Sequence, residues 1–190
     1  MKKKKKLVWN SPVVLCFAAV CFVVMVLNLL TGGLTNRLLF TTYRAPLSSP
    51  LTWIRFFTHV FGHSGWTHLI GNMSYLLLLG PMLEEKYGSK RILGTMAVTA
   101  VITGAVNFLL FPDTALCGAS GIVFAFILLT SFTSFREGEI PVTVILVALI
   151  FIGQQVYEGL FVRDNVSNLT HILGGVIGAV IGYRLNRRLR

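Results

Sequence analysis

The chain has 190 residues, of which 54% are hydrophobic and only 13% are charged, whereas an average soluble domain has about 25% charged residues. Its mean hydropathy of +0.73 excludes a soluble globular protein. The net charge of +10 does not indicate nucleic acid as a partner, because the basic residues lie at the chain ends and in short segments between apolar runs. We therefore expect a lipid bilayer, and no nucleic acid, around this chain.

The cysteines give no sign of a disulfide or a metal site. Cys16 and Cys21 lie within the first apolar run and Cys117 lies alone, so neither an even framework nor C-x-x-C spacing occurs. We expect no disulfide, no metal and no cofactor.

The first apolar run follows the basic stretch Lys2–Lys6, as in a signal peptide. It is longer than the usual ~7 to 15 residues and lacks an A-x-A cleavage site, so we expect it to remain as a membrane span.

Stretches without Lys, Arg, Asp or Glu mark six expected membrane-spanning helices, each close to the roughly 20 residues that a bilayer requires. They cover approximately residues 11–31, 65–83, 92–111, 117–135, 141–159 and 168–186. Gly62 and Gly65 interrupt the run before the second helix, which leaves a long outer loop over residues 32–64. The sequence thus predicts an all-α fold, a polytopic bundle of six transmembrane helices, with residues 1–190 in a single membrane domain.

The basic residues favour one orientation of this bundle. With a cytoplasmic amino terminus, most of the 17 basic residues lie on the inner side, and the outer side holds Arg37, Arg44, Arg55 and Arg163. This is the bias expected from the positive-inside rule. Both termini are therefore predicted to be cytoplasmic, and the membrane to be the plasma (inner) membrane if the source is bacterial.

Three of the expected spans run inward and carry polar side chains at a similar depth: His68 and Asn72, Ser120, and His171. At ~1.5 Å per residue, these residues lie about 20 to 24 Å from the inner ends of their spans, in the outer part of a ~30 Å hydrocarbon core. Singly, a membrane serine usually bonds its own helix and a lone histidine links helices. Together at one depth they favour a shared functional site.

The surroundings of Ser120 and His171 indicate nucleophilic chemistry. Ser120 stands between Gly118 and Gly121 at the start of an apolar helix, where free backbone amides favour an anion. Gly174 and Gly178 follow His171 on one helix face and allow close packing on a neighbouring span. If that neighbour carries Ser120, the imidazole can act as its general base. Because no carboxylate is expected at this depth, the sequence favours a Ser/His dyad.

His68 and Asn72 lie one turn apart and share a helix face. Their side-chain donors could stabilise the oxyanion of a tetrahedral intermediate. The alternative is a pair that only bonds to a neighbouring span. Gln154, Gln155 and Glu158 near the end of the fifth span could line a substrate gate or be interfacial, and we do not include them in the catalytic set.

Three patterns in order resemble the rhomboid family of intramembrane serine proteases, in its minimal six-span bacterial form. They are His63-x4-His68-x3-Asn72, Gly118-x-Ser120-Gly121 and His171-x2-Gly174-x3-Gly178, and the likeness covers almost all of the chain after the first span. The resemblance implies that Ser120 is the nucleophile and His171 the base. It also implies an oxyanion hole made by His68, Asn72 and the Ser120 amide, and a single-span transmembrane protein as substrate, cleaved near the outer surface.

Two positions depart from that family's pattern. The Trp-Arg pair of its first loop is here Trp53-Ile54-Arg55, and Phe124 stands where some members place a tyrosine that stacks on the catalytic histidine. A second hypothesis is a catalytically silent rhomboid-like protein that binds membrane clients, although such relatives typically lack the serine or the histidine. A third is a small transporter or channel, which would be expected to carry broken helices or carboxylates near the midplane. The sequence does not indicate an oligomeric state.

Overall fold

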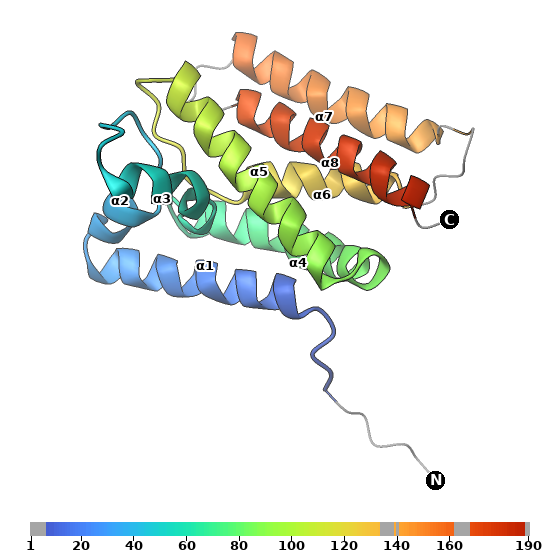
Figure 1. The fold of residues 1–190 in the computed structure, drawn as a ribbon, viewed down its shortest axis with the longest axis horizontal. Helices are drawn as coiled ribbons and strands as arrows, with labels where there is room; N and C mark the ends of the chain where they lie inside the picture. Colours follow the sequence, from blue (N-terminus) through green and yellow to red (C-terminus); the bar gives the residue numbers. More distant parts are fainter. Residues whose placement is uncertain (1–6, 134–138, 140, 162–167, 189–190) are drawn as a thin grey trace.

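The computed structural model describes residues 7–133, 139, 141–161 and 168–188, and in this part of the chain the fold is all-α (Figure 1). The helices are α1 (Pro12–Leu30), α2 (Leu34–Leu39), α3 (Pro50–Thr58), the 3-10 helix η1 (His59–Phe61), α4 (Trp66–Tyr87), α5 (Ser89–Leu110), α6 (Ser120–Ser131), α7 (Val142–Phe161) and α8 (Asn168–Arg188). The only β-type pairing among these residues is an isolated bridge between Thr42 and Leu116. The predicted helical fold class is confirmed.

Helix length and composition identify fewer candidate membrane crossings among the described residues than the six expected. Among the described residues, α1, α5 and α7 are long and apolar enough to cross a membrane. Helices α4 and α8 have 22 and 21 residues but carry charged side chains near their carboxyl ends. Helix α6 has 12 residues, which is about 18 Å at ~1.5 Å per residue and shorter than a bilayer core. Six crossings therefore stay a prediction.

Two segments differ from the expected helix boundaries. Helix α6 spans Ser120–Ser131 and does not begin at residue 117. It cannot begin earlier, because Gly118 has a φ of 128°, which lies outside the helical region. The segment 32–64 is not simply a loop, since it contains α2, α3 and η1. Pro50 at the first turn starts α3. Arg55 is buried in it and donates from Nε to the Leu38 carbonyl at 2.8 Å.

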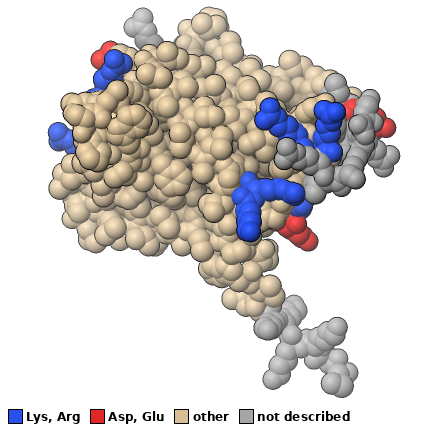
Figure 2. All heavy atoms as spheres, viewed as in Figure 1, with Lys and Arg blue, Asp and Glu red and all other residues tan. Residues whose placement is uncertain are grey.

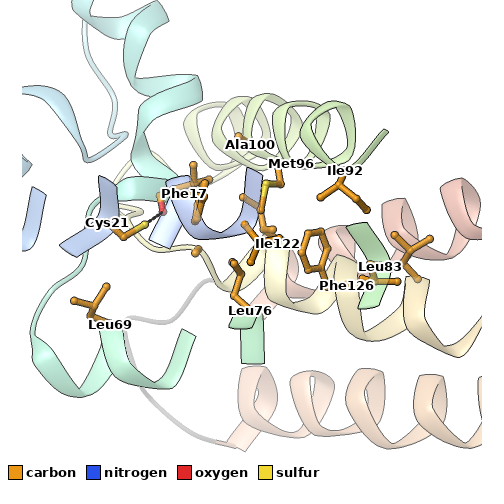
Figure 3. Packing of buried hydrophobic residues seen from close by; sticks show 14 of the residues in the cluster. Phe17, Cys21, Leu69, Leu76, Leu83, Ile92, Met96, Ala100, Ile122 and Phe126 are labelled. Atoms are coloured by element: carbon orange, nitrogen blue, oxygen red, sulfur yellow. Dashed lines mark hydrogen bonds between the residues drawn. The ribbon is translucent and has the colours of Figure 1, made fainter. Parts of the chain in front are cut away.

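Helix α6 occupies the middle of the bundle, where it contacts α4, α5 and α8, while α7 lies outside against α8 and α6 (Figure 1). Apolar side chains of α1, α4, α5 and α6 point toward one another in the core, among them Phe17, Leu76, Met96 and Phe126 (Figure 3). The central position of α6 means that its first residue is reached by side chains from several helices.

Small residues bring α8 directly onto α6. A Cβ at Gly174 would overlap the carbonyl oxygen of Gly121, and one at Gly178 would overlap that of Ala125. Only glycine permits backbones to approach in this way. The predicted small-residue strip is thus the surface on which α8 meets α6.

Charged side chains gather at the ends of the bundle. Figure 2 shows Lys and Arg over the end at which α4 and α8 finish and α5 begins, and an uncharged middle. This distribution is that of a protein whose middle contacts lipid and whose ends contact water.

Candidate active site

Ser120 and His171 meet between the first turns of α6 and α8. His171 Nε2 lies 2.8 Å from Ser120 Oγ, and both side chains are half-buried. The contact depends on the close approach of the two helices at Gly174 and Gly178. The distance allows a serine hydroxyl to pass its proton to an imidazole.

An aromatic ring fixes the plane of the His171 imidazole. Phe124, one turn after Ser120 on α6, stacks on it with centroids 4.7 Å apart and planes inclined by 8°. Phe151 of α7 supports Phe124 from the edge at 5.5 Å. The stack expected at this position is therefore present with phenylalanine in place of tyrosine.

A side chain outside the predicted catalytic set contacts the other nitrogen of His171. Gln155 Oε1 of α7 lies 2.6 Å from His171 Nδ1, and Gln155 Nε2 donates to Glu158 Oε2 at 3.2 Å. Gln154 Nε2 donates to the other carboxylate oxygen at 2.9 Å. The available signal was a Gln and a Glu three residues apart in an otherwise apolar helix, but only the packing of α7 on α8 gives it a target.

His68 and Asn72 of α4 face Gly118, two residues before Ser120. A Cβ at Gly118 would lie 2.7 Å from His68 Nε2 and 3.6 Å from Asn72 Nδ2, so a side chain there would displace them. Ser64 Oγ lies 3.1 Å from His68 Nδ1. Asn72 is buried, and its Nδ2 has no hydrogen-bond partner among the described residues. A buried donor of this kind is available to an oxygen of a bound molecule.

Backbone hydrogen bonds hold the segment that precedes Ser120. Gly118 N donates to the His59 carbonyl at 2.9 Å, and Thr42 and Leu116 exchange two bonds of 2.9 Å each. His59 is buried, and its Nε2 lies 3.0 Å from the Ala100 carbonyl. The connection between α1 and α4 therefore positions the site as well as covering it.

His63, the first residue of the motif that contains His68 and Asn72, lies behind His68 in the protein interior. It is fully buried, with its ring edge-on to that of His68 at 5.0 Å, and its carbonyl accepts from Asn36 Nδ2 at 2.8 Å. Burial lowers the pKa of His63 to about 4, so its ring is neutral near pH 7. Its contacts make it a support for His68.

A cavity of about 720 Å³ opens beside these residues. Ser120, His171, His68 and Asn72 line it together with the apolar side chains of Phe124 and Ile127. In the described part of the chain, no group of three or more His, Cys, Asp or Glu side chains is arranged to hold a metal ion. The cavity combines a paired serine and histidine, apolar walls and the Asn72 Nδ2 donor, which has no partner among the described residues.

Comparison with known proteins identifies the family. A family model described as Rhomboid domain matches residues 50–188. The chain is 32% identical over 139 residues to Rhomboid-related protein 1 of Caenorhabditis elegans, covering 68% of this chain and 39% of that protein. It is 27% identical over 140 residues to Rhomboid protease GlpG of Haemophilus influenzae, covering 72% and 71%. It is 29% identical over 171 residues to Rhomboid protease GluP of Bacillus subtilis, covering 85% and 32%.

The chain spans about half or less of the length of several relatives that it matches, including the nematode protein. The family model nevertheless covers most of the chain and includes every residue named above as lining the cavity. The chain belongs to the rhomboid family of integral membrane proteins.

Proposed function

We propose that this chain is an intramembrane serine endopeptidase that cleaves transmembrane proteins with a Ser120/His171 dyad. The observation that carries the proposal is the 2.8 Å contact between Ser120 Oγ and His171 Nε2 at the wall of a cavity. Membership of a family that includes named rhomboid proteases supports the same conclusion. No cofactor is required for this chemistry, because a serine and a base suffice for acyl transfer.

In the first step Ser120 Oγ attacks the carbonyl carbon of the scissile peptide bond. The hydroxyl proton passes to His171 Nε2, and the carbonyl oxygen becomes an oxyanion. Collapse of this intermediate breaks the C–N bond, and the imidazolium returns its proton to the leaving amine. The products of this step are the released amine and an acyl-enzyme ester on Ser120.

Three donors are proposed to stabilise the oxyanion: His68 Nε2, Asn72 Nδ2 and the backbone amide of Ser120. Donation from the Ser64 hydroxyl to His68 Nδ1, across 3.1 Å, would leave the proton on Nε2, the nitrogen that faces Gly118. Asn72 Nδ2 is buried and unpaired among the described residues. Donors that are fixed before the reaction stabilise developing charge most effectively.

In the second step a water molecule from the cavity attacks the ester. His171 takes a proton from the water, the Ser120 Oγ–C bond breaks, and the proton returns to Ser120 Oγ. The carboxylic acid product leaves and the dyad is restored. A volume of about 720 Å³ has room for several water molecules beside a peptide segment.

The proposed substrate is a single-span transmembrane protein that enters laterally and is cleaved near the outer surface. We propose that both termini of this chain are cytoplasmic, as the larger group of Lys and Arg at the end where α4 and α8 finish supports (Figure 2). Ser120 then lies toward the outer side, and in a bacterial source the membrane is the plasma membrane. The glycines at 118, 121, 174 and 178 are proposed to support the site by letting backbones approach it.

A catalytically silent client-binding protein is the competing function. Reaction with a fluorophosphonate probe separates the two, because the probe needs an activated serine and no substrate. We expect the detergent-purified wild type to be labelled, and Ser120→Ala and His171→Ala to remain unlabelled at an unchanged unfolding temperature. A well-folded wild type that neither reacts with the probe nor cleaves a transmembrane test substrate would favour client binding. Cleavage retained by Ser120→Ala would refute the nucleophile assignment.

A further inference from the structure

We propose that Gln155, oriented by Glu158, is a positioning residue that fixes the tautomer and the direction of the His171 ring. The inference rests on the proposed Ser120/His171 dyad and extends it to a series of hydrogen bonds. This series connects the Glu158 carboxylate, the Gln155 amide, the His171 imidazole and the Ser120 hydroxyl, in that order.

The burial of Gln155 is unusual for its helix. Among the described side chains of α7, only those of Val144 and Gln155 are buried, whereas Leu149 is 65% exposed and Tyr157 is 60% exposed. A glutamine at one of the few contact points of an otherwise lipid-facing helix has to be hydrogen-bonded to offset its desolvation. Its two partners here are Glu158 and His171.

The Glu158 carboxylate decides which way the amide points. A carboxylate only accepts hydrogen bonds, so the amide end that faces it, at 3.2 Å from Oε2, has to be the NH₂ group. The carbonyl oxygen of Gln155 then faces His171. Gln154 Nε2 bonds the second carboxylate oxygen at 2.9 Å and limits rotation of the carboxylate.

The amide in turn decides which nitrogen of His171 carries the proton. A carbonyl oxygen only accepts, so the 2.6 Å contact requires that Nδ1 donates. In the neutral imidazole, Nε2 then holds a lone pair, and this is the nitrogen that faces Ser120 Oγ at 2.8 Å. The other tautomer would place two hydrogens between Nε2 and Oγ, or leave the serine without a base.

The same contact favours the protonated state that forms during attack. When Nε2 takes the serine proton, the ring becomes an imidazolium and its Nδ1–H bond to Gln155 becomes charge-assisted. Hydrogen bonds in a chain polarise one another, so the Glu158 carboxylate increases the negative charge on the Gln155 oxygen. A neutral amide beside the ring also avoids the desolvation of a carboxylate at this buried position.

The test compares single variants with an exchanged pair, using the saturable reaction of the detergent-purified full chain with a fluorophosphonate probe. Gln155→Met keeps the side-chain volume and removes the acceptor, and we expect the maximal labelling rate to fall about tenfold, which corresponds to one hydrogen bond of about 1.4 kcal/mol. The half-saturating probe concentration should not change. Leu149→Met, on the lipid-facing side of α7, is the matched control and should label at the wild-type rate.

The exchanged pair is the decisive variant. In the combination Gln155→Glu with Glu158→Gln, a carboxylate oxygen at 155 accepts from His171 Nδ1. The amide at 158 donates to that carboxylate, so the hydrogen bond between 155 and 158 reverses its direction, but Nδ1 keeps an acceptor. We expect this variant to label at no less than about one third of the wild-type rate, because an acceptor for Nδ1–H is restored. A role of Gln155 in packing alone predicts no loss in Gln155→Met in the first place, because methionine keeps the side-chain volume.

The outcomes separate this inference from the proposed function. A wild type that does not react contradicts the proposed enzyme itself. Reactive wild type with Gln155→Met equal to Leu149→Met overturns the positioning role and leaves the dyad standing. Loss in Gln155→Met without recovery in the exchanged pair, at unchanged unfolding temperatures, also overturns it. Loss followed by recovery supports it.

Discussion

The Glu84 side chain ties the end of α4 to the beginning of α1, and its removal should destabilise the bundle without touching the active site. Its carboxylate accepts from the amides of Val13 and Val14 at 3.0 and 3.1 Å and from Ser89 Oγ at 2.7 Å. The two amides belong to the first turn of α1, where helical partners are missing and the helix dipole favours negative charge.

The cost of Glu84→Ala follows from these partners. Glu84 is 4% exposed and Val14 is fully buried, so the Val14 amide loses its bond without access to water. Val13 and Ser89 are half-buried and recover part of theirs from solvent. With ~1 to 3 kcal/mol for each unsatisfied buried donor, the total loss is about 3 kcal/mol. For a chain of this length, that lowers the unfolding temperature by roughly 6 to 12 °C.

Thermal unfolding in detergent, followed by circular dichroism, measures this loss. Glu85→Ala changes an exposed neighbouring carboxylate and should shift the midpoint by no more than about 1 °C. Well below the transition, Glu84→Ala should still label with fluorophosphonate, since Glu84 is not among the residues that line the cavity with Ser120. A midpoint for Glu84→Ala equal to that of Glu85→Ala would show that these hydrogen bonds do not stabilise the junction of α1 and α4.

Three further changes probe the site and its cover. Gly178→Val should separate α8 from α6 and slow probe labelling about 100-fold. The control Gly94→Val, where a Cβ meets open space, should have little effect. Equal labelling rates for the two variants would show that the close contact of α8 with α6 does not position His171. His68→Ala should lower the cleavage rate about 100-fold with residual activity, and unchanged kinetics would exclude His68 as a donor. Burial lowers the pKa of both His59 and His63 to about 4 from 6.5, so the unfolded state binds more protons between these values and stability should fall as pH drops from about 6.5 toward 4. Unfolding midpoints at pH 7.5 and pH 5 measure this, and the difference should shrink when both histidines are replaced by glutamine.

Helix positions could be predicted because charged residues mark the ends of apolar runs. The helices α4, α5, α7 and α8 contain most of the expected spans 65–83, 92–111, 141–159 and 168–186, respectively. The same criterion failed before Ser120, where the positive φ of Gly118 and the pairing of Leu116 with Thr42 prevent a helix. It also failed over residues 32–64, since α3 is short and carries the buried Arg55, whose charge contacts the Tyr43 ring 4.5 Å away.

The proximity of Ser120 and His171 was predictable because the glycines after His171 form a flat helix surface on which another helix can pack closely. Gln155 was not, because a glutamine near the end of an apolar helix is equally compatible with an interfacial position. Its direction depends on the rotation of α7 about its axis and on the 2.6 Å contact with a different helix. The spacing of residues within one helix predicts neither the rotation of that helix nor its contacts with another helix.

The hydrogen bonding of two side chains at the site bears on the choice between an enzyme and a client-binding protein. Gln155 has both ends of its amide paired, with His171 and with Glu158. Asn72 Nδ2 is buried and unpaired among the described residues, at a cost of about 1 to 3 kcal/mol in the resting state. A bound oxygen that gains charge recovers more of this cost than a neutral carbonyl does. A donor that has no partner in the resting state, and bonds best to an oxygen that gains charge, therefore stabilises a transition state more than a ground-state ligand. The proposed peptidase requires this preference, and a client-binding protein does not.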